Sequence, residues 1–251
     1  MKEYKVDRLT VRILDSREAM GEAAAKDIHD RILALLTEKE TINMIFAAAP
    51  SQNEALSALV KYDDIDWSRI NAFHMDEYIG LTDESKSFGR YLRDHIFGLV
   101  NFRSVNYIDF GAADHETECE RYSKLLHDNP TDIVVMGIGE NGHIAFNDPW
   151  VADFNDPKAV KVVKLDEVCR NQQVNDGCFD TLESVPKAAV TLTCPTLAAA
   201  AYQFCVVPAK TKANAVKRTL EGKINADCPA TILRTLPAAA LYLDPDSAAL
   251  L

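Results

Sequence analysis

Short apolar runs alternate with segments of helical periodicity along the 251-residue chain. An apolar run of about four to eight residues is typical of a buried strand, whereas apolar residues roughly three and four positions apart are typical of an amphipathic helix. This pattern predicts strands at 41–48, 70–75, 132–137, 160–163, 188–192, 202–207 and 239–243. It predicts helices at 16–36, 53–60, 88–99, 116–127 and 211–220.

The alternation of strands and helices predicts a single α/β domain spanning residues 1–251. Its sheet is expected to be mostly parallel and doubly wound, with helices on both faces. In such sheets ligands bind beyond the carboxyl ends of the strands, so polar residues that directly follow a strand are candidates for a site. Four groups meet this condition: Ser51-Gln52, Asp76-Glu77, the loop 137–149, and Lys210 with Lys212.

The loop 137–149 (GIGENGHIAFNDP) is the most informative segment of the chain. Its glycines let the backbone approach a ligand closely, and His143 can exchange a proton near neutral pH. Asp148 can orient this imidazole or compensate its charge. The glycine spacing departs from the dinucleotide-binding fingerprint, so no nucleotide cofactor is expected. A tight turn with a structural histidine is the alternative interpretation.

Two carboxylates, Asp76 and Glu77, follow the expected strand 70–75. A partly buried carboxyl has a raised pKa and can act as a general base near neutral pH. A solvated acidic loop or a helix cap explains the same residues equally well. A metal site made of His74, Asp76, His143 and Asp148 has no short ligand pair such as His-Glu-x-x-His to support it, so no metal is expected.

A candidate anion site lies where the strand 41–48 leads into a helix. Ser51 with Glu54 three residues later fits a capping box, and a helix N-terminus offers free N–H groups to an anion. Lys212 begins the last expected helix, where a cation is unfavourable unless it faces a bound anion. A plain helix cap and an exposed surface lysine are the alternatives.

Composition narrows the function classes. Lys and Arg number 27 against 38 Asp and Glu, a formal net charge of −11, which disfavours nucleic acid and anionic membranes as partners. The N-terminus lacks a signal-peptide core, and the apolar segment 188–207 is interrupted by Thr, Pro and Gln, so no membrane span is expected. Six scattered cysteines without a Cys-x-x-Cys pair predict reduced thiols in a cytoplasmic protein.

Taken together, these segments resemble the glucosamine-6-phosphate deaminase (isomerase) family, which shares its fold with 6-phosphogluconolactonases. The likeness covers nearly the whole chain and is carried by Asn71–Leu81, Gly137–Pro149, Val185–Thr191 and Lys212–Gly222. The resemblance implies a 2-amino-2-deoxyhexose 6-phosphate as the small-molecule partner and chemistry without a metal or other cofactor. A homo-oligomer is one possible state.

The resemblance also implies roles for individual residues. His143 would open the pyranose by acid–base catalysis at the ring oxygen, while Asn141 and Asp148 hold the imidazole. Asp76 would move the proton from C2 to C1 through an enolamine, giving a ketose phosphate and ammonia. The phosphate would be bound by Ala48, Ala49, Ser51, Gln52 and Lys212, with Arg170 as an added cation.

This sequence departs from the family pattern at several of these positions. Asn141 stands where many relatives have Asp, and Asp148 stands where Glu is common. The sequence Ala48-Ala49-Pro50 replaces a frequent Gly-Gly pair, and Gln173 replaces a basic residue that Arg170 is expected to compensate. The altered phosphate loop leaves galactosamine 6-phosphate as a rival to glucosamine 6-phosphate.

Two other functions remain open at the level of the sequence. A lactonase of the same fold would hydrolyse an ester and would need no base at C2. The segments Asp76-Glu77-Tyr78 and Phe146–Pro149 are more typical of the deaminases. A sugar-phosphate-binding regulator without catalysis is the third hypothesis, which the presence of Asp76 and His143 disfavours.

Overall fold

In a computed structural model that describes residues 1–251, an eight-stranded sheet forms the centre of the protein. Its strand order is β1-β2-β11-β10-β7-β3-β4-β6. All its neighbouring strands pair in parallel except the β1–β2 hairpin. The predicted α/β class with a mostly parallel sheet is therefore confirmed. The strands are β1 (Lys2–Val6), β2 (Leu9–Ile13), β3 (Ile42–Phe46), β4 (Ile70–His74), β6 (Ser104–Asn106), β7 (Ile133–Met136), β10 (Tyr202–Val207) and β11 (Ala239–Leu243).

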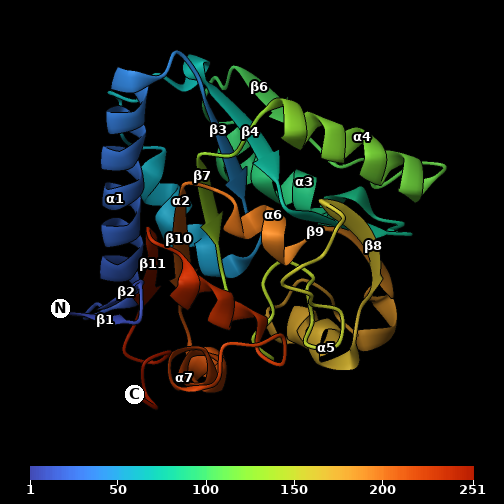
Figure 1. Ribbon diagram of the computed structural model, residues 1–251. Coiled ribbons are helices and arrows are strands. Elements are labelled where there is room, and N and C mark those ends of the chain that lie inside the picture. Colours follow the sequence, from blue (N-terminus) through green and yellow to red (C-terminus); the bar gives the residue numbers. More distant parts are fainter.

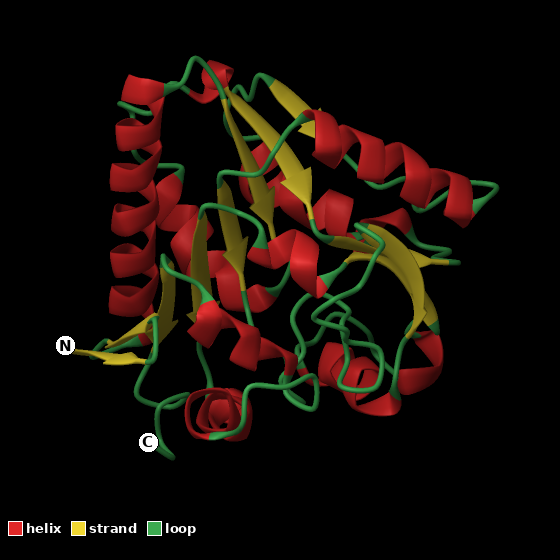
Figure 2. Cartoon of the chain, in the orientation of Figure 1, coloured by secondary structure: helices red, strands yellow, loops and turns green.

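Helices cover both faces of this sheet, as Figures 1 and 2 show. Successive strand residues point to opposite faces. On β3, Met44 and Phe46 belong to the same core as residues of α1, whereas Ile45 belongs to the core that includes residues of α4 and α7. The helices are α1 (Arg17–Glu38), α2 (Asn53–Leu59), α3 (Phe88–Leu92), α4 (His115–Asp128), α5 (Glu167–Asn175), α6 (Cys194–Ala198) and α7 (Ala213–Glu221).

A second, smaller sheet corrects the expected topology. The predicted strands at 160–163 and 188–192 exist, but they form an antiparallel sheet with a strand that the sequence analysis missed. Its order is β5-β9-β8, with β5 at Asp76–Ile79, β9 at Ala188–Leu192 and β8 at Val160–Lys164. Only Met75 separates β4 from β5, and its carbonyl accepts a hydrogen bond from Leu192 N at 2.8 Å. Asp76 therefore lies where the two sheets meet.

The predicted helices are present with shifted ends. The Ser16 hydroxyl accepts a hydrogen bond from Ala19 N at 3.1 Å and caps α1, as its position in the sequence suggested. The segment predicted as one helix at 88–99 is α3 followed by a π-helical turn at Arg93–Phe97. None of the helices combines the length and the apolar character needed to cross a membrane.

Candidate active site

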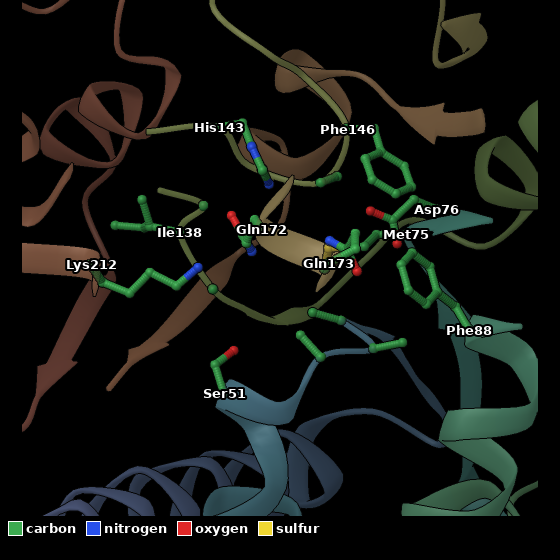
Figure 3. A pocket seen from close by; sticks show the side chains of 16 residues that line it. Ser51, Met75, Asp76, Phe88, Ile138, His143, Phe146, Gln172, Gln173 and Lys212 are labelled. Carbon is green, nitrogen blue, oxygen red and sulfur yellow. The ribbon is translucent and has the colours of Figure 1, made fainter. Parts of the chain in front are cut away.

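A pocket lies beyond the carboxyl ends of β3, β4, β7 and β10, where ligands bind in sheets of this type. Figure 3 shows Ser51 and Lys212 on one side of it, Asp76 on the other, and the His143 imidazole pointing in between them. The structure thus brings together segments from four parts of the sequence. Six predicted site residues line this pocket: Ala48, Ala49, Ser51, Asp76, His143 and Lys212.

The His143 imidazole is held from behind by two oxygen atoms. Its Nδ1 lies 2.9 Å from Asn141 Oδ1 and 3.2 Å from Asp148 Oδ1, and both oxygens are acceptors. Nδ1 must therefore carry a proton, which leaves Nε2 free to exchange a proton with a ligand in the pocket. Burial opposes ionisation of Asp148, but hydrogen bonds from His143 and Asn141 hold the pKa of its carboxyl below the ordinary value.

Gly139 provides the space in which the His143 ring lies. A Cβ atom at position 139 would be 2.1 Å from His143 Cε1 and 2.3 Å from Nε2, far inside van der Waals contact. Gly139 N also donates a hydrogen bond to the His143 carbonyl at 2.9 Å. The glycine-rich loop is therefore a close-packed support for one imidazole.

Asp76 is a buried carboxyl facing the pocket from the start of β5. Burial, with a contribution from the neighbouring Glu77, raises the pKa of Asp76 well above its ordinary value. Such a carboxyl binds a proton more tightly than an exposed one, which makes it a stronger general base near neutral pH.

Glu77 points away from the pocket into a ring of backbone donors. Its carboxylate accepts hydrogen bonds from the N–H groups of Tyr78, Phe88 and Gly89 at 2.9–3.1 Å. Burial nevertheless raises the pKa of Glu77 to about 7, although these three hydrogen bonds act in the opposite direction. The two adjacent carboxyls thus have different surroundings, and only Asp76 lines the pocket.

Lys212 supplies a buried cation without a partner. Its side chain is 4% exposed, and its Nζ makes no hydrogen bond within the protein. Burial lowers the pKa of the ammonium below its ordinary value. An uncompensated charge in this position costs folding free energy, and an anionic ligand would compensate it.

The turn after β3 offers neutral donors close to this cation. The backbone N–H groups of Ala48, Ala49 and Ser51 donate to no acceptor within the protein. The Ser51 hydroxyl accepts from Gln52 Nε2 at 2.9 Å, which leaves its hydrogen free for a ligand. Gln52 itself is buried behind the pocket, where Nε2 also donates to the Val206 carbonyl.

The expected capping box in this turn is wrong. The chain forms a 3-10 turn at Pro50–Gln52 before α2, and no Ser51 side chain caps the helix. Glu54 instead forms an ion pair with Arg17 Nε at 2.8 Å. The donors that remain for an anion are therefore separate N–H groups and a hydroxyl.

A sequence profile of the family described as Glucosamine-6-phosphate isomerases/6-phosphogluconolactonase matches residues 15–241. The chain belongs to this family. Relatives named glucosamine-6-phosphate deaminase, from Bacillus cereus (strain B4264) and Bacillus thuringiensis (strain Al Hakam), are each 31% identical over 243 residues, or 96% of this chain and 89% of the relative. The resemblance that the sequence motifs suggested is thereby confirmed.

Solved structures agree with this assignment. A protein described as a monomeric glucosamine-6-phosphate deaminase is similar, with a TM-score of 0.86 and 29% identity, over 96% of this chain and 99% of the other. A 6-phosphogluconolactonase from Thermotoga maritima shares the fold, with a TM-score of 0.75 and 20% identity, over 94% of this chain and 99% of the other.

Arg170 does not lie in the pocket of this member of the glucosamine-6-phosphate isomerase family. Its guanidinium donates to the carbonyls of Leu182 and Val185, and its side chain is buried there. The expected compensation of Gln173 by Arg170 is therefore not present. Gln172 and Gln173, both on α5, line the pocket instead, beside Lys212 as the only Lys or Arg side chain.

The loop that replaces the frequent Gly-Gly pair needs no unusual backbone. Neither Ala48 nor Ala49 has a positive φ, and Ala49 is extended at φ −158°. Tyr91 Oη donates to the Ala49 carbonyl at 2.7 Å and fixes the turn. The alanine methyl groups therefore fit without strain in this shape of the loop.

One cluster of potential metal ligands lies behind the imidazole. His143, Asp148 and Cys169 place ligand atoms within 4.8 Å of one another. Burial raises the pKa of the Cys169 thiol well above its ordinary value, and nearby Asp148 and Asp166 act in the same direction. The thiolate is the form that binds metals, so this set of donors suits a metal ion poorly.

Some residues of the site carried no signal in the sequence. Phe88 and Phe146 line the pocket and stack with ring centroids 5.6 Å apart. Their hydrophobic spacing is the same as that of core residues, which hides such a role. Of the two α5 glutamines, Gln172 gave no signal, and Gln173 was noticed only as the replacement of a basic residue of the family.

Proposed function

We propose that this protein deaminates and isomerises a 2-amino-2-deoxyhexose 6-phosphate, giving a ketohexose 6-phosphate and ammonia. The observation that carries the proposal is that Asp76, His143 and the unpaired Lys212 line one pocket. A base, an acid–base pair and an anion site are the groups that this reaction needs. The 31% identity to relatives named glucosamine-6-phosphate deaminase supports this substrate class.

In the proposed reaction, His143 acts first. Nε2 takes the proton of the C1 hydroxyl and delivers it to the ring oxygen as the bond between C1 and that oxygen breaks, and the pyranose opens to the aldehyde. Asp148 stabilises the imidazolium through its contact with Nδ1. A positioned acid or base of this kind contributes about 10²–10⁴ to the rate.

Asp76 acts on the open chain. Its carboxylate removes the C2 proton while the C2 ammonium gives one proton to O1, which forms an enolamine, and it then returns the first proton to C1. The resulting imine at C2 adds water and releases ammonia, so one water is consumed overall. These steps use only side chains of this protein, with the phosphate held by Lys212, Ser51 and the free N–H groups of the turn.

A direct assay with three substrates tests the proposal. Purified protein is incubated with glucosamine 6-phosphate, galactosamine 6-phosphate or 6-phosphogluconolactone, while ammonia and acid release are followed. We expect ammonia from at least one amino sugar phosphate. Acid release from the lactone without any ammonia would identify a lactonase, and binding without turnover would identify a regulator. The ratio of kcat/KM for the two amino sugars decides the epimer.

Replacing the proposed base tests the assignment of roles. In Asp76→Asn, exchange of the C2 proton with solvent deuterium should fall below detection, because an amide cannot accept that proton. Substrate binding should stay near that of the wild type, since the phosphate contacts are on the other side of the pocket. Persistent exchange in this variant would show that Asp76 is not the base.

A further inference from the structure

The Asn141 side-chain amide lies between the catalytic pair and a carboxylate of α5 that no step above uses. Its Nδ2 is 2.9 Å from Asp148 Oδ1 and 3.4 Å from Asp166 Oδ2. Its Oδ1 accepts from both the backbone N–H and Nδ1 of His143. Each end of the amide thus has a different set of partners.

This arrangement fixes which way the amide points. With carboxylates on the nitrogen side, a flipped Asn141 would place its oxygen against two negative groups and its NH₂ against the Nδ1–H of His143. The observed orientation satisfies both N–H bonds and keeps an acceptor on Nδ1. The carboxylates of Asp148 and Asp166 together hold the amide that positions His143.

Asp166 also belongs to the helix that covers the pocket. Its Oδ1 accepts from Cys169 N at 2.6 Å and caps α5, and its own N–H lies 3.5 Å from Asp148 Oδ2. Farther along the same helix, Gln172 Oε1 accepts from Glu140 N at 2.8 Å. With the contact between Asn141 and Asp166, three contacts therefore join α5 and its cap to the loop that carries His143.

We propose that Asp166 is a positioning residue for His143, acting through the amide of Asn141, and that it ties the placement of α5 to the orientation of the imidazole. An acidic residue at position 141 is unfavourable in the same geometry, because it would bring a third carboxylate between Asp148 and Asp166. Only the kinetic consequence of this proposal rests on the proposed function, since the coupling itself exists without substrate.

The first variant is Asp166→Asn, with Asp166→Ser beside it. Asn and Ser are both good helix caps, so α5 should keep its N-terminus while the carboxylate is lost. We expect kcat for the cyclic amino sugar phosphate to fall about tenfold, a loss of about 1.4 kcal/mol. Binding of inorganic phosphate should be unchanged, because Lys212 and Ser51 are untouched. Asp114→Asn, which alters the cap of α4 outside the pocket, should match the wild type.

The second measurement needs no substrate. The ring nitrogens of His143 are observed by ¹⁵N NMR with the imidazole neutral, and the share of the tautomer with its proton on Nδ1 should fall in both Asp166 variants, because the Asn141 amide that accepts from Nδ1 is then held by one carboxylate fewer. Asp114→Asn should leave the tautomer ratio in place. A change in helix capping alone would not move it. This readout remains valid even if no amino sugar phosphate is turned over.

A double-mutant cycle completes the test. Asn141→Asp should lower the melting temperature more in the wild type than in the Asp166→Asn background, where one of the three carboxylates is absent. Such non-additivity would support the coupling. Additive effects together with an unchanged His143 tautomer ratio would overturn the proposal, and circular dichroism confirms that each variant is folded.

Discussion

At the scale of single residues, the site depends on a position without a side chain and on a charge without a partner. Gly139 has no side chain, and the His143 ring occupies the space where one would be. Lys212 has a charge but no partner within the protein. The unpartnered charge of Lys212 lowers the stability of the protein without a ligand, and the His143 ring leaves no room for a larger residue at position 139. Each feature leads to a prediction.

Gly139→Ala should displace the His143 imidazole. The new methyl group would overlap the ring, and a misplacement of about 1 Å can cost about 10²-fold in rate. We expect ammonia release to fall by that order while the protein stays folded. Gly111→Ala is the matched control, since its Cβ would meet only Asp109 Oδ1 at 3.4 Å. Near-normal activity of Gly139→Ala would contradict the assigned support of the ring.

Lys212→Met should have opposite effects on the stability of the protein and on its binding of phosphate. Removing a buried, unpartnered cation should raise the free energy of unfolding by on the order of 1–3 kcal/mol. The same change should abolish the stabilisation that inorganic phosphate gives to the wild type. Urea denaturation with and without phosphate measures both effects. The exposed Lys210, changed to Met, is the control and should keep the response to phosphate; a Lys212→Met protein that still responds would refute the anion site.

The sequence predicted the candidate site residues better than it predicted the contacts these residues make. Asp76, His143 and Lys212 follow strands and have functional groups that stand out from the apolar pattern. Arg170 was misplaced because a guanidinium near a site can equally bind backbone carbonyls, and the sequence does not distinguish these uses. The contact between Asn141 and Asp166 joins residues 25 positions apart, so it required the fold.

At the scale of elements, the turn after β10 contains a strained backbone at Ala209 and positions Lys212. Ala209 has φ 82° and ψ 147°, a region that favours glycine, and its N–H donates to the Asp244 carboxylate at 3.1 Å. The Ala209 carbonyl accepts from Lys212 N at 3.0 Å. This turn therefore holds the lysine at the edge of the pocket at a cost in backbone energy.

Ala209→Gly should relieve that strain. Backbone strain of this kind costs about 1–3 kcal/mol, and the added freedom of glycine in the unfolded chain offsets about 0.5–1 kcal/mol of the gain. We expect a net stabilisation of about 1 kcal/mol by thermal or urea denaturation. Ala213→Gly, at a regular helical position with φ −56°, should instead destabilise by about 1 kcal/mol. Destabilisation by both variants would argue against strain at Ala209.

Hydrophobic pattern predicted most elements but not how they assemble. The alternation of apolar and charged residues in the first 15 positions belongs to the β1–β2 hairpin, in which buried Leu9 and Val11 alternate with polar residues and no apolar run forms. β5 was not predicted as a strand, because its first residues are Asp76 and Glu77. The strands β8 and β9 have the same pattern as parallel strands, so their antiparallel sheet was not foreseeable from periodicity.

At the scale of the whole molecule, buried carboxyls link stability to pH. Burial raises the pKa of Glu77 from 4.5 to about 7, so the folded state binds a proton more tightly than the unfolded chain. The stabilising effect of that proton is full below about 4.5 and is lost as pH rises to about 7. Asp76 has a shift in the same direction, whereas the lowered pKa of Asp148 contributes stability that is lost in acid.

The free energy of unfolding should therefore fall as pH rises from about 5 to 7. The contribution of Glu77 is up to about 3 kcal/mol, because one pKa unit corresponds to about 1.4 kcal/mol. Urea denaturation across this range measures the slope. Glu77→Gln should flatten it even though the variant is less stable overall, and the exposed Glu120→Gln should not change it. An equal slope in wild type and Glu77→Gln would rule out this origin.

The position of Asp76 at the junction of the two sheets has a consequence for how such enzymes diverge. The proposed anchor for the phosphate is built by loops of the parallel sheet, whereas Asp76, the proposed base, begins the small antiparallel one. Substitutions in the small antiparallel sheet can therefore change the reaction without weakening the proposed binding of the sugar phosphate by the loops of the parallel sheet. A family whose description covers both isomerases and lactonases is what such a division of labour would produce over evolutionary time.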